Sequence, residues 1–309
     1  MPNYPLVFIH TGQQSYLKKV IKLAEKYQNK VYLVGDKSNR KYCSNWVDSN
    51  ELEINKYFEF EKIYRHMSTN RIEFETGCIK RYYLLYAFMN KMNIDSCFMM
   101  DSDVCVYSNL GNLDFEEYDV ACGVVDNGIP NTWCASPHSS FWKKEALKNY
   151  LIYLYELYRN KDCRLEKIWG YHQRNNLFGG ISDMVLLRLW LNDEKPRWKN
   201  LAVAEEGQVF DDNVNCSCNY IGQEYQLRNL LFKRKIKKII FSENKAFLVN
   251  MEGKNIEALI VHAQGEAKMY ISCLTKGRNS MFSYYLADIY HEVTTWICHG
   301  ILIRRLKGE

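Results

Sequence analysis

The sequence is poor in the features that mark several large classes of protein. Only 5 of its 309 residues are proline, and it contains no internal repeat and no low-complexity tract, so its composition excludes a fibrous or disordered chain. No apolar run approaches the roughly 18 residues that a membrane-spanning helix needs. Lys and Arg (41) barely outnumber Asp and Glu (36), and the excess is spread along the chain, which argues against a nucleic-acid partner. What remains is a globular chain long enough for one large α/β domain or two smaller ones.

The cysteines and the N-terminal segment indicate the cellular compartment. The eleven cysteines are odd in number and show no spacing typical of a small disulfide-rich domain. The first ten residues lack a basic segment and hold only a short apolar run, unlike a signal peptide. We therefore expect reduced thiols and a cytoplasmic protein.

Two segments leave contact with a membrane surface open. The basic run Lys233–Lys238 is either a solvated face or a contact for anionic lipid headgroups. The segment Trp296–Arg305 joins an apolar stretch to a basic end, as do helices that lie in the lipid interface. Peripheral contact with an anionic membrane, on its inner face, is therefore an alternative to a freely cytoplasmic protein.

The first 36 residues predict a strand, a helix and a strand. Leu6–Ile9 and Val31–Val34 are short apolar runs of the buried-strand type, and apolar residues recur between them with helical spacing. Such a βαβ unit implies parallel strands. Further strands are predicted at 97–100, 119–125 and 258–261, and further helices through 85–92, at 143–159, at 183–191 and from 283 towards 305. We expect an α/β fold with a mostly parallel sheet flanked by helices and a less regular C-terminal part.

Polar side chains follow several of these strands. His10-Thr11-Gly12, Asp36, Asp101-Ser102-Asp103 and His262 each stand at the end of a predicted strand, and the carboxyl ends of parallel strands meet at one edge of a sheet. Asp101 and Asp103 are two residues apart on what we take to be extended backbone, so both carboxylates leave by the same face and can share a divalent cation. Oxygen ligands favour Mg²⁺ or Mn²⁺, and an added imidazole favours Mn²⁺.

His262 opens a second pattern, H-x-x-G-x-x-K. Its imidazole would complete the metal shell, Gly265 would allow a phosphate to approach the backbone closely, and Lys268 would neutralise the charge of a diphosphate.

These residues resemble those of metal-dependent nucleotide-sugar glycosyltransferases of the GT-A fold. The acidic triplet at 101–103 after an apolar strand resembles the signature of that group. The segment from His262 to Lys268 is similar to the C-terminal motif of the retaining family that includes glycogenin and bacterial lipooligosaccharide galactosyltransferases. The resemblance covers roughly residues 5–270.

The resemblance implies roles for individual residues. Asp101, Asp103 and His262 would bind the metal, with Asp101 also near the ribose, Ser102 beside the nucleotide and Lys268 on the diphosphate. His10, Thr11, Gly12 and Asp36 would lie at the nucleobase and ribose, and Arg81 near the nucleotide. Asp183 would lie at the donor sugar and acceptor, either orienting substrate in a retaining enzyme or acting as general base in an inverting one. The implied division is a nucleotide-binding half (1–125), an acceptor-side half (126–270) and a C-terminal helical extension (271–309).

The expected reaction is therefore transfer of a sugar from a nucleoside diphosphate sugar, such as a UDP-sugar, to a hydroxyl of a glycan or lipid-linked acceptor in surface polysaccharide synthesis, with retention favoured. A haloacid-dehalogenase-type phosphatase is the main alternative. It would use Asp101 as nucleophile and Asp211-Asp212 as a later metal pair, but its first motif belongs to the first strand of the fold. A nucleotidyltransferase would need a glycine-rich phosphate loop after the first strand, and a sugar-binding protein without activity would not need to gather carboxylates, His and Lys at one edge.

Overall fold

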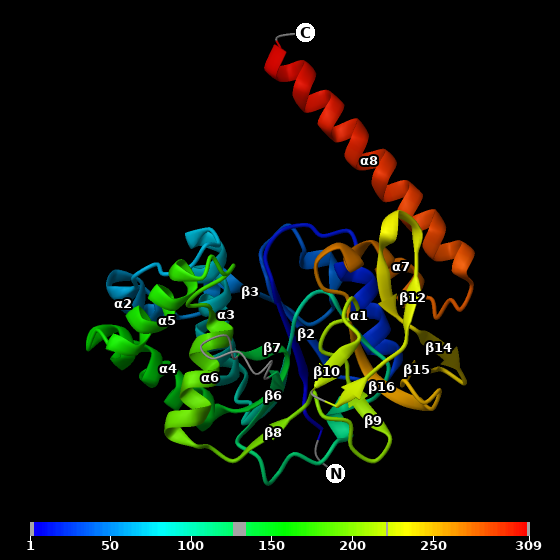
Figure 1. Ribbon diagram of the computed structural model, residues 1–309. Helices are drawn as coiled ribbons and strands as arrows, with labels where there is room; N and C mark the ends of the chain where they lie inside the picture. The colour runs from blue at the N-terminus through cyan, green and yellow to red at the C-terminus, as the bar shows by residue number, and fades with distance from the viewer. Residues whose placement is uncertain (1–2, 126–133, 221, 308–309) are drawn as a thin grey trace.

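The computed structural model describes residues 3–125, 134–220 and 222–307. Its centre is a seven-stranded sheet in the order β3-β2-β1-β4-β7-β6-β8 (Figure 1). Four of its six pairings are parallel and two, both made by β7, are antiparallel. The strands span Leu6–His10 (β1), Val31–Gly35 (β2), Trp46–Asp48 (β3), Ser96–Met100 (β4), Val120–Val125 (β6), Cys134–Lys143 (β7) and Trp198–Asn200 (β8). The sheet is thus mostly parallel, as predicted.

Helices cover both faces of this sheet. Alternate residues of β1 point to opposite sides, so Leu6 and Phe8 enter one apolar core and Val7 the other. The first core contains α1, and the second is formed with α2, α3, α4, α5 and α6, which lie together on the left of Figure 1. The helices span Leu17–Lys26 (α1), Asn55–Ile63 (α2), Ile72–Met92 (α3), Lys144–Arg159 (α4), Cys163–Arg174 (α5) and Asp183–Glu194 (α6).

A second sheet, which the sequence did not predict, packs against the α1 side. Its order is β14-β15-β16-β5, and β9 pairs with β16. These strands span Val104–Val106 (β5), Gln208–Phe210 (β9), Ile239–Ser242 (β14), Lys245–Val249 (β15) and Asn255–His262 (β16). Since β5 follows β4 after only three residues, the segment at 101–103 passes from one sheet to the other.

Short elements complete the second half of the chain. Two small hairpins pair β10 (Cys218–Tyr220) with β11 (Gln223–Glu224) and β12 (Leu227–Asn229) with β13 (Lys235–Lys237). The 3-10 helices span Arg40–Tyr42, Ser49–Glu51, Leu110–Asn112, Leu231–Lys233 and Gly265–Tyr270, the last labelled η5.

The chain ends in α7 (Ile271–Leu274) and the long helix α8 (Met281–Lys307). The first turns of α8 are tied to the body through Asp288, which accepts hydrogen bonds from the Tyr270 hydroxyl and the Leu231 amide. Beyond Glu292, which pairs with Arg234, the helix projects away from the rest of the molecule (Figure 1). Among the described residues, none of the helices is both long and apolar enough to cross a membrane.

The basic run at 233–238 is only partly solvated, so the prediction of a solvated face is wrong for two of its members. Lys237 is fully buried, and Arg234 forms ion pairs with Glu266 and Glu292. Two of the positive charges in this run therefore have partners within the protein.

Candidate functional site

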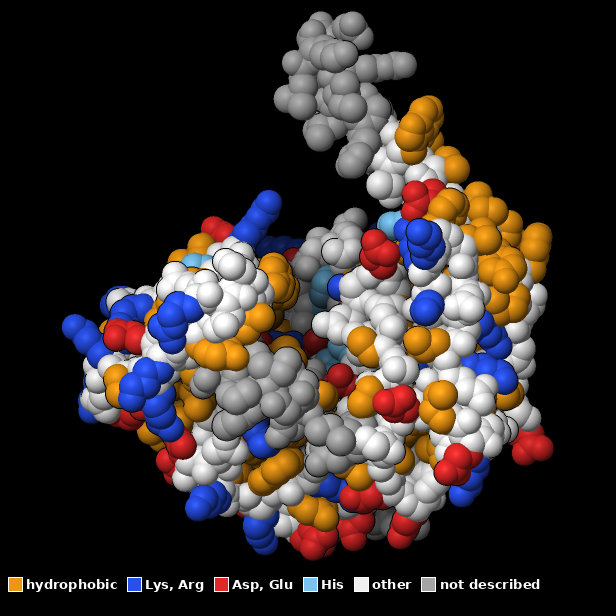
Figure 2. All heavy atoms as spheres, in the orientation of Figure 1, with side chains coloured by type: hydrophobic (Ala, Val, Ile, Leu, Met, Phe, Trp, Pro, Cys, Tyr) orange, Lys and Arg blue, Asp and Glu red, His pale blue; other side chains and the backbone are white. Residues whose placement is uncertain are grey.

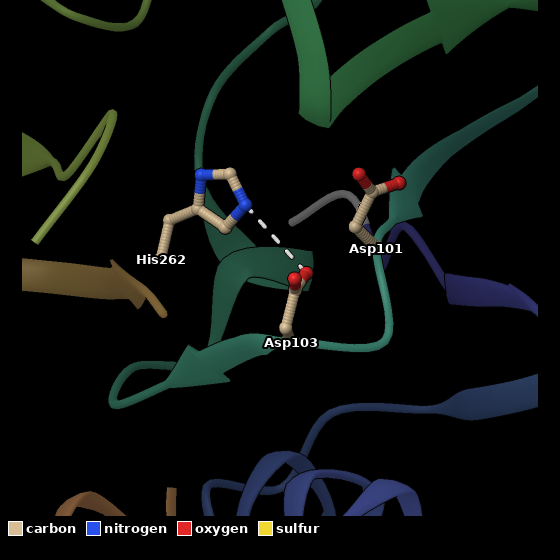
Figure 3. Close-up of side chains that lie close together, drawn as sticks. All are labelled: Asp101, Asp103 and His262. Atoms are coloured by element: carbon tan, nitrogen blue, oxygen red, sulfur yellow. Dashed lines mark ion pairs between the residues drawn. The ribbon is translucent and has the colours of Figure 1, made fainter. Parts of the chain in front are cut away.

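The two predicted metal carboxylates lie in the turn between β4 and β5. The amide of Asp101 donates to the carbonyl of His138 at 2.7 Å, and the amide of Val104 donates to the carbonyl of Asp101 at 3.2 Å. This is a tight turn and not the extended backbone that the sequence predicted. The turn still brings the side chains of Asp101 and Asp103 to the same place (Figure 3).

His262 reaches this turn through strand pairing. In the antiparallel register of β16 with β5, His262 stands opposite Val104, the residue after Asp103. The ligand atoms of Asp101, Asp103 and His262 all lie within 4.8 Å of one another, and the imidazole Nε2 is 3.5 Å from Asp103 Oδ1 (Figure 3). Asp103 is only 6% exposed and His262 5%. The structure thus brings together three residues that are up to 161 positions apart (262 minus 101).

The imidazole of His262 is oriented for metal binding. Its Nδ1 lies 2.6 Å from the carbonyl oxygen of Asp212, so Nδ1 carries the hydrogen and Nε2 faces the carboxylates. The backbone amide of His262 donates to Asp211 Oδ2 at 3.1 Å. A second hydrogen bond that fixes the tautomer and ring orientation is typical of metal-ligating histidines. Two carboxylates and one imidazole in this arrangement fit Mn²⁺ or Mg²⁺.

The charges in this cluster affect one another strongly. Burial by itself would raise the pKa of Asp103, but contacts with His262 and Lys268 hold that pKa well below its ordinary value. The ammonium of Lys268 lies 3.2 Å from Asp103 Oδ2. Burial would lower the pKa of His262, yet the neighbouring Asp103 carboxylate raises it to about 9. Burial raises the pKa of Asp101, with the charge of Asp103 adding to the effect and the guanidinium of Arg81 opposing it.

Arg81 links the acidic turn to Asp183. One terminal nitrogen of its guanidinium donates to Asp101 and the other to Asp183 Oδ2 at 2.5 Å. Asp183 is buried in the first turn of α6, whose N-cap is Ser182 as the sequence predicted. The Tyr82 hydroxyl also contacts Asp183 Oδ2 at 3.4 Å. Asp183 and Asp101 are therefore held on one guanidinium.

Arg81, Asp101, Asp103 and Lys268 border a cleft of about 580 Å³. Figure 2 shows the surface hollowed between the two halves of the molecule, with basic and histidine side chains inside the hollow. Seven of the predicted site residues line the cleft: His10, Thr11, Arg81, Asp101, Ser102, Asp103 and Lys268. Two exposed aromatic residues that the sequence did not single out, Phe58 and Phe74, also line it.

Gly12, Asp36, Asp183, His262 and Gly265 are not among the lining residues. Asp36 accepts hydrogen bonds from the Gly12 amide at 2.5 Å and the Ser38 amide at 2.8 Å, so its carboxylate shapes the loop after β1. The hydrogen bond from the Ser38 hydroxyl is the main reason that its pKa is lowered. Gly265 begins η5 with φ of 59°, in the left-handed region, and a side chain there would meet no neighbouring atom. The turn geometry, not crowding, explains this glycine.

The sequence did not predict a buried ion pair that supports His262. Lys237 Nζ lies 2.5 Å from Asp211 Oδ1, both side chains are fully buried, and Asn219 Oδ1 accepts from the same ammonium at 2.7 Å. Because the other oxygen of Asp211 accepts the amide of His262, this pair fixes the backbone that carries the imidazole. Asp211 is thus engaged by Lys237 and does not form a metal pair with Asp212, as the phosphatase alternative would require. The local sequence carries no signal for this pair, since Lys237 lies in a run of charged residues.

Comparison with known proteins gives little. No family model and no curated protein matches the sequence. One solved structure with some likeness is mouse xyloside xylosyltransferase 1 in its apo form (TM-score 0.42, 11% identity, covering 64% of this chain and 84% of that one). Another is a glycosyltransferase involved in glycosylation of the major capsid of PBCV-1 (TM-score 0.39, 11% identity, covering 88% of this chain and 98% of that one). A third is the glycosyltransferase GlyE of Streptococcus pneumoniae TIGR4 (TM-score 0.35, 15% identity, covering 65% of this chain and 45% of that one). TM-scores below 0.5 are too low to support an inference of function, so function has to be inferred from the side chains of the site.

Proposed function

We infer that the protein is a metal-dependent glycosyltransferase that moves a sugar from a nucleoside diphosphate sugar, such as a UDP-sugar, to a glycan or glycolipid hydroxyl. The observation that carries this inference is the convergence of Asp101, Asp103 and His262 within 4.8 Å beside Lys268, with the two carboxylates and the lysine lining the cleft. Carboxylates, an imidazole and a lysine suit a cation together with the diphosphate bound to it.

Asp101, Asp103 and His262 would hold Mn²⁺ or Mg²⁺. When bound, the ion would supply Lewis acidity towards the diphosphate leaving group. Lys268, which is held at Asp103, would add a fixed positive charge next to the same oxygens. His10 and Thr11 at the end of β1, with Phe58 and Phe74 on the wall of the cleft, would enclose the nucleoside.

Asp183 is better suited to orient substrate than to accept a proton. Its carboxylate is buried and does not line the cleft, and its Oδ2 is held by Arg81 and the Tyr82 hydroxyl, whereas a general base must lie within reach of the acceptor. With Asp183 so engaged, the departing diphosphate would take the proton of the acceptor hydroxyl. This favours retention of configuration over inversion.

A membrane-bound or lipid-linked acceptor in surface polysaccharide synthesis would agree with the exposed face of α8. Its large exposed apolar side chains fall within an arc of about 120° of the helix surface: Phe282, Leu286, Ile289, Tyr290, Val293, Trp296 and Ile297. Figure 2 shows hydrophobic side chains gathered where α8 leaves the body. The predicted basic end at 304–305 lies outside the residues whose side chains are described. Peripheral contact with an anionic membrane remains part of the proposal.

Thermal unfolding in the presence of UDP and Mn²⁺ tests the proposed function. Free ligand at 100 times its Kd stabilises the folded state by about 2.7 kcal/mol, so the unfolding temperature should rise and EDTA should abolish the rise. Asp103→Asn should lose the response, while Asp95→Asn, a change to an exposed carboxylate just before β4, should keep it. Stabilisation by phosphomonoesters and by no nucleotide would instead favour the phosphatase. Hydrolysis measured over a panel of nucleotide sugars would then identify the donor.

A further inference from the structure

We propose that a second cavity, formed by α2, α3 and α4, is a binding site for a neutral oligosaccharide. The cavity has a volume of about 620 Å³, within the range of roughly 300–1,000 Å³ found for small-molecule sites. It is lined from all three helices, and it contains none of the residues assigned above to the metal or the nucleotide.

An unsatisfied hydroxyl in its wall suggests that a polar ligand belongs there. Tyr83 lines the cavity and is only 4% exposed, and its hydroxyl is buried with no hydrogen-bond partner among the described residues. The Tyr83 ring is fixed by two aromatic contacts: its centroid lies 5.6 Å from that of Tyr57, edge to face, and 6.0 Å from that of Phe60. A buried donor without a partner is costly, and a ligand hydroxyl that displaced the side chains closing the Tyr83 hydroxyl off from the cavity would remove that cost.

The other lining residues have the composition that sugars require. Tyr86 and Tyr155 supply further aromatic rings from α3 and α4, and the exposed side chain of Asn90 supplies an amide. Aromatic rings can pack against the apolar faces of pyranose rings, while amides and phenols bond to the hydroxyl groups at their edges.

The charges around the cavity favour an uncharged ligand. The lining contains three carboxylates and two ammonium groups, so neither sign dominates. Most of these charges already have a partner one helical turn away, in the ion pairs Lys56–Glu59, Glu145–Lys148 and Glu156–Arg159.

The cavity lies next to the active-site cleft. Ile54 lines both, and α3 separates them, with Arg81 towards the cleft and Tyr83 towards the cavity. A glycan bound in this cavity would hold the acceptor close to the cleft where its hydroxyl reacts. This role of the cavity rests on the proposed function. The binding itself is argued from the cavity alone.

Ligand-observed NMR on the full chain tests the inference with five neutral probes: maltohexaose, cellohexaose, laminarihexaose, chitohexaose and mannohexaose. At least one should bind the wild type. Tyr155→Ala should weaken that binding roughly tenfold, and Tyr83→Phe about fivefold. Tyr158→Phe is the matched control, since its hydroxyl is also buried without a partner among the described residues but does not line the cavity.

Three results would overturn the inference: no probe binds, the binding is unchanged in both cavity variants, or the cavity takes only an apolar probe such as lauric acid. The unfolding temperature of each variant shows whether it is folded. Tyr83→Phe should be at least as stable as the wild type because it removes an unsatisfied group. Asp103→Asn should retain oligosaccharide binding while losing the response to UDP and Mn²⁺. Failure of the cavity and failure of the proposed transferase are therefore measured separately.

Discussion

The imidazole rings of His138 and His262 stack face to face, with centroids 4.2 Å apart and planes 5° from parallel. His138 is buried, and burial together with the positive charge of His262 lowers its pKa far below the ordinary value, so it packs as a neutral ring. Its Nδ1 contacts the Ser136 hydroxyl at 2.7 Å, and its own carbonyl accepts the amide of Asp101. His138 thus supports two of the three candidate metal ligands without being one.

His138→Ala should therefore weaken Mn²⁺ binding by roughly tenfold to a hundredfold, as is usual when the residues that orient metal ligands are removed. His138→Phe keeps a flat ring against His262 and should lose less. Mn²⁺ titration followed by electron paramagnetic resonance measures both, with the exposed His66→Ala as control. Equal affinity in His138→Ala and the wild type would show that the stacked ring does not position His262.

The buried pair of Lys237 and Asp211 should matter for folding. Lys237→Met leaves a buried carboxylate without its partner, which typically costs roughly 3–5 kcal/mol, whereas the double variant Asp211→Asn/Lys237→Met should recover much of that loss. Urea unfolding measures both. A loss below about 1 kcal/mol in the single variant would contradict the account.

Metal binding should release a proton. In the metal-free protein the pKa of His262 is raised to about 9, because the effect of Asp103 outweighs that of burial, so at pH 7 its Nε2 carries a proton. A metal-ligating imidazole must be neutral, so the affinity for Mn²⁺ should rise up to about tenfold per pH unit until pH 9. The groups facing this imidazole are Asp101, Asp103 and the neutral ring of His138. Titration calorimetry at pH 7 in two buffers of different ionisation enthalpy should report about one proton released; none would contradict the prediction.

The exposed face of α8 should bind lipid. Trp296 is 79% exposed and Tyr290 73%, so the double change Tyr290→Ser/Trp296→Ser should reduce co-sedimentation with vesicles of phosphatidylcholine and phosphatidylserine. Ile152→Ser, an exposed apolar residue on α4, is the matched control. Equal sedimentation of all three proteins would exclude this face, and concentration-dependent dimerisation without vesicle binding would assign it to a second copy of the chain.

Local sequence patterns were sufficient for much of the fold and for the three candidate metal ligands. The apolar runs of β1 and β2 and the strand before Asp101 are short-range signals, and His262 follows an equally clear strand. The pairing of β16 with β5, which brings His262 to Asp103, depends on contacts far apart in the chain. The residue types at the strand ends suggested that His262 and Asp103 lie close together, but only the structure gives the register in which β16 pairs with β5.

The supporting residues could not be found in this way. Lys237 has the neighbours of a solvent-exposed lysine, and its partner Asp211 is 26 positions away. His138 lies in a strand rich in polar residues, with no apolar run to indicate burial. Such residues are buried because particular hydrogen-bond partners meet them there, and those partners are set by the tertiary fold.

Anomalous scattering of manganese in crystals grown with Mn²⁺ and UDP would show whether Asp101, Asp103 and His262 bind the ion. We expect one strong peak within coordination distance of these three residues, with diphosphate density extending from it towards Lys268. A peak at any other cluster, or UDP bound in the cleft with no manganese at these three residues, would contradict this prediction.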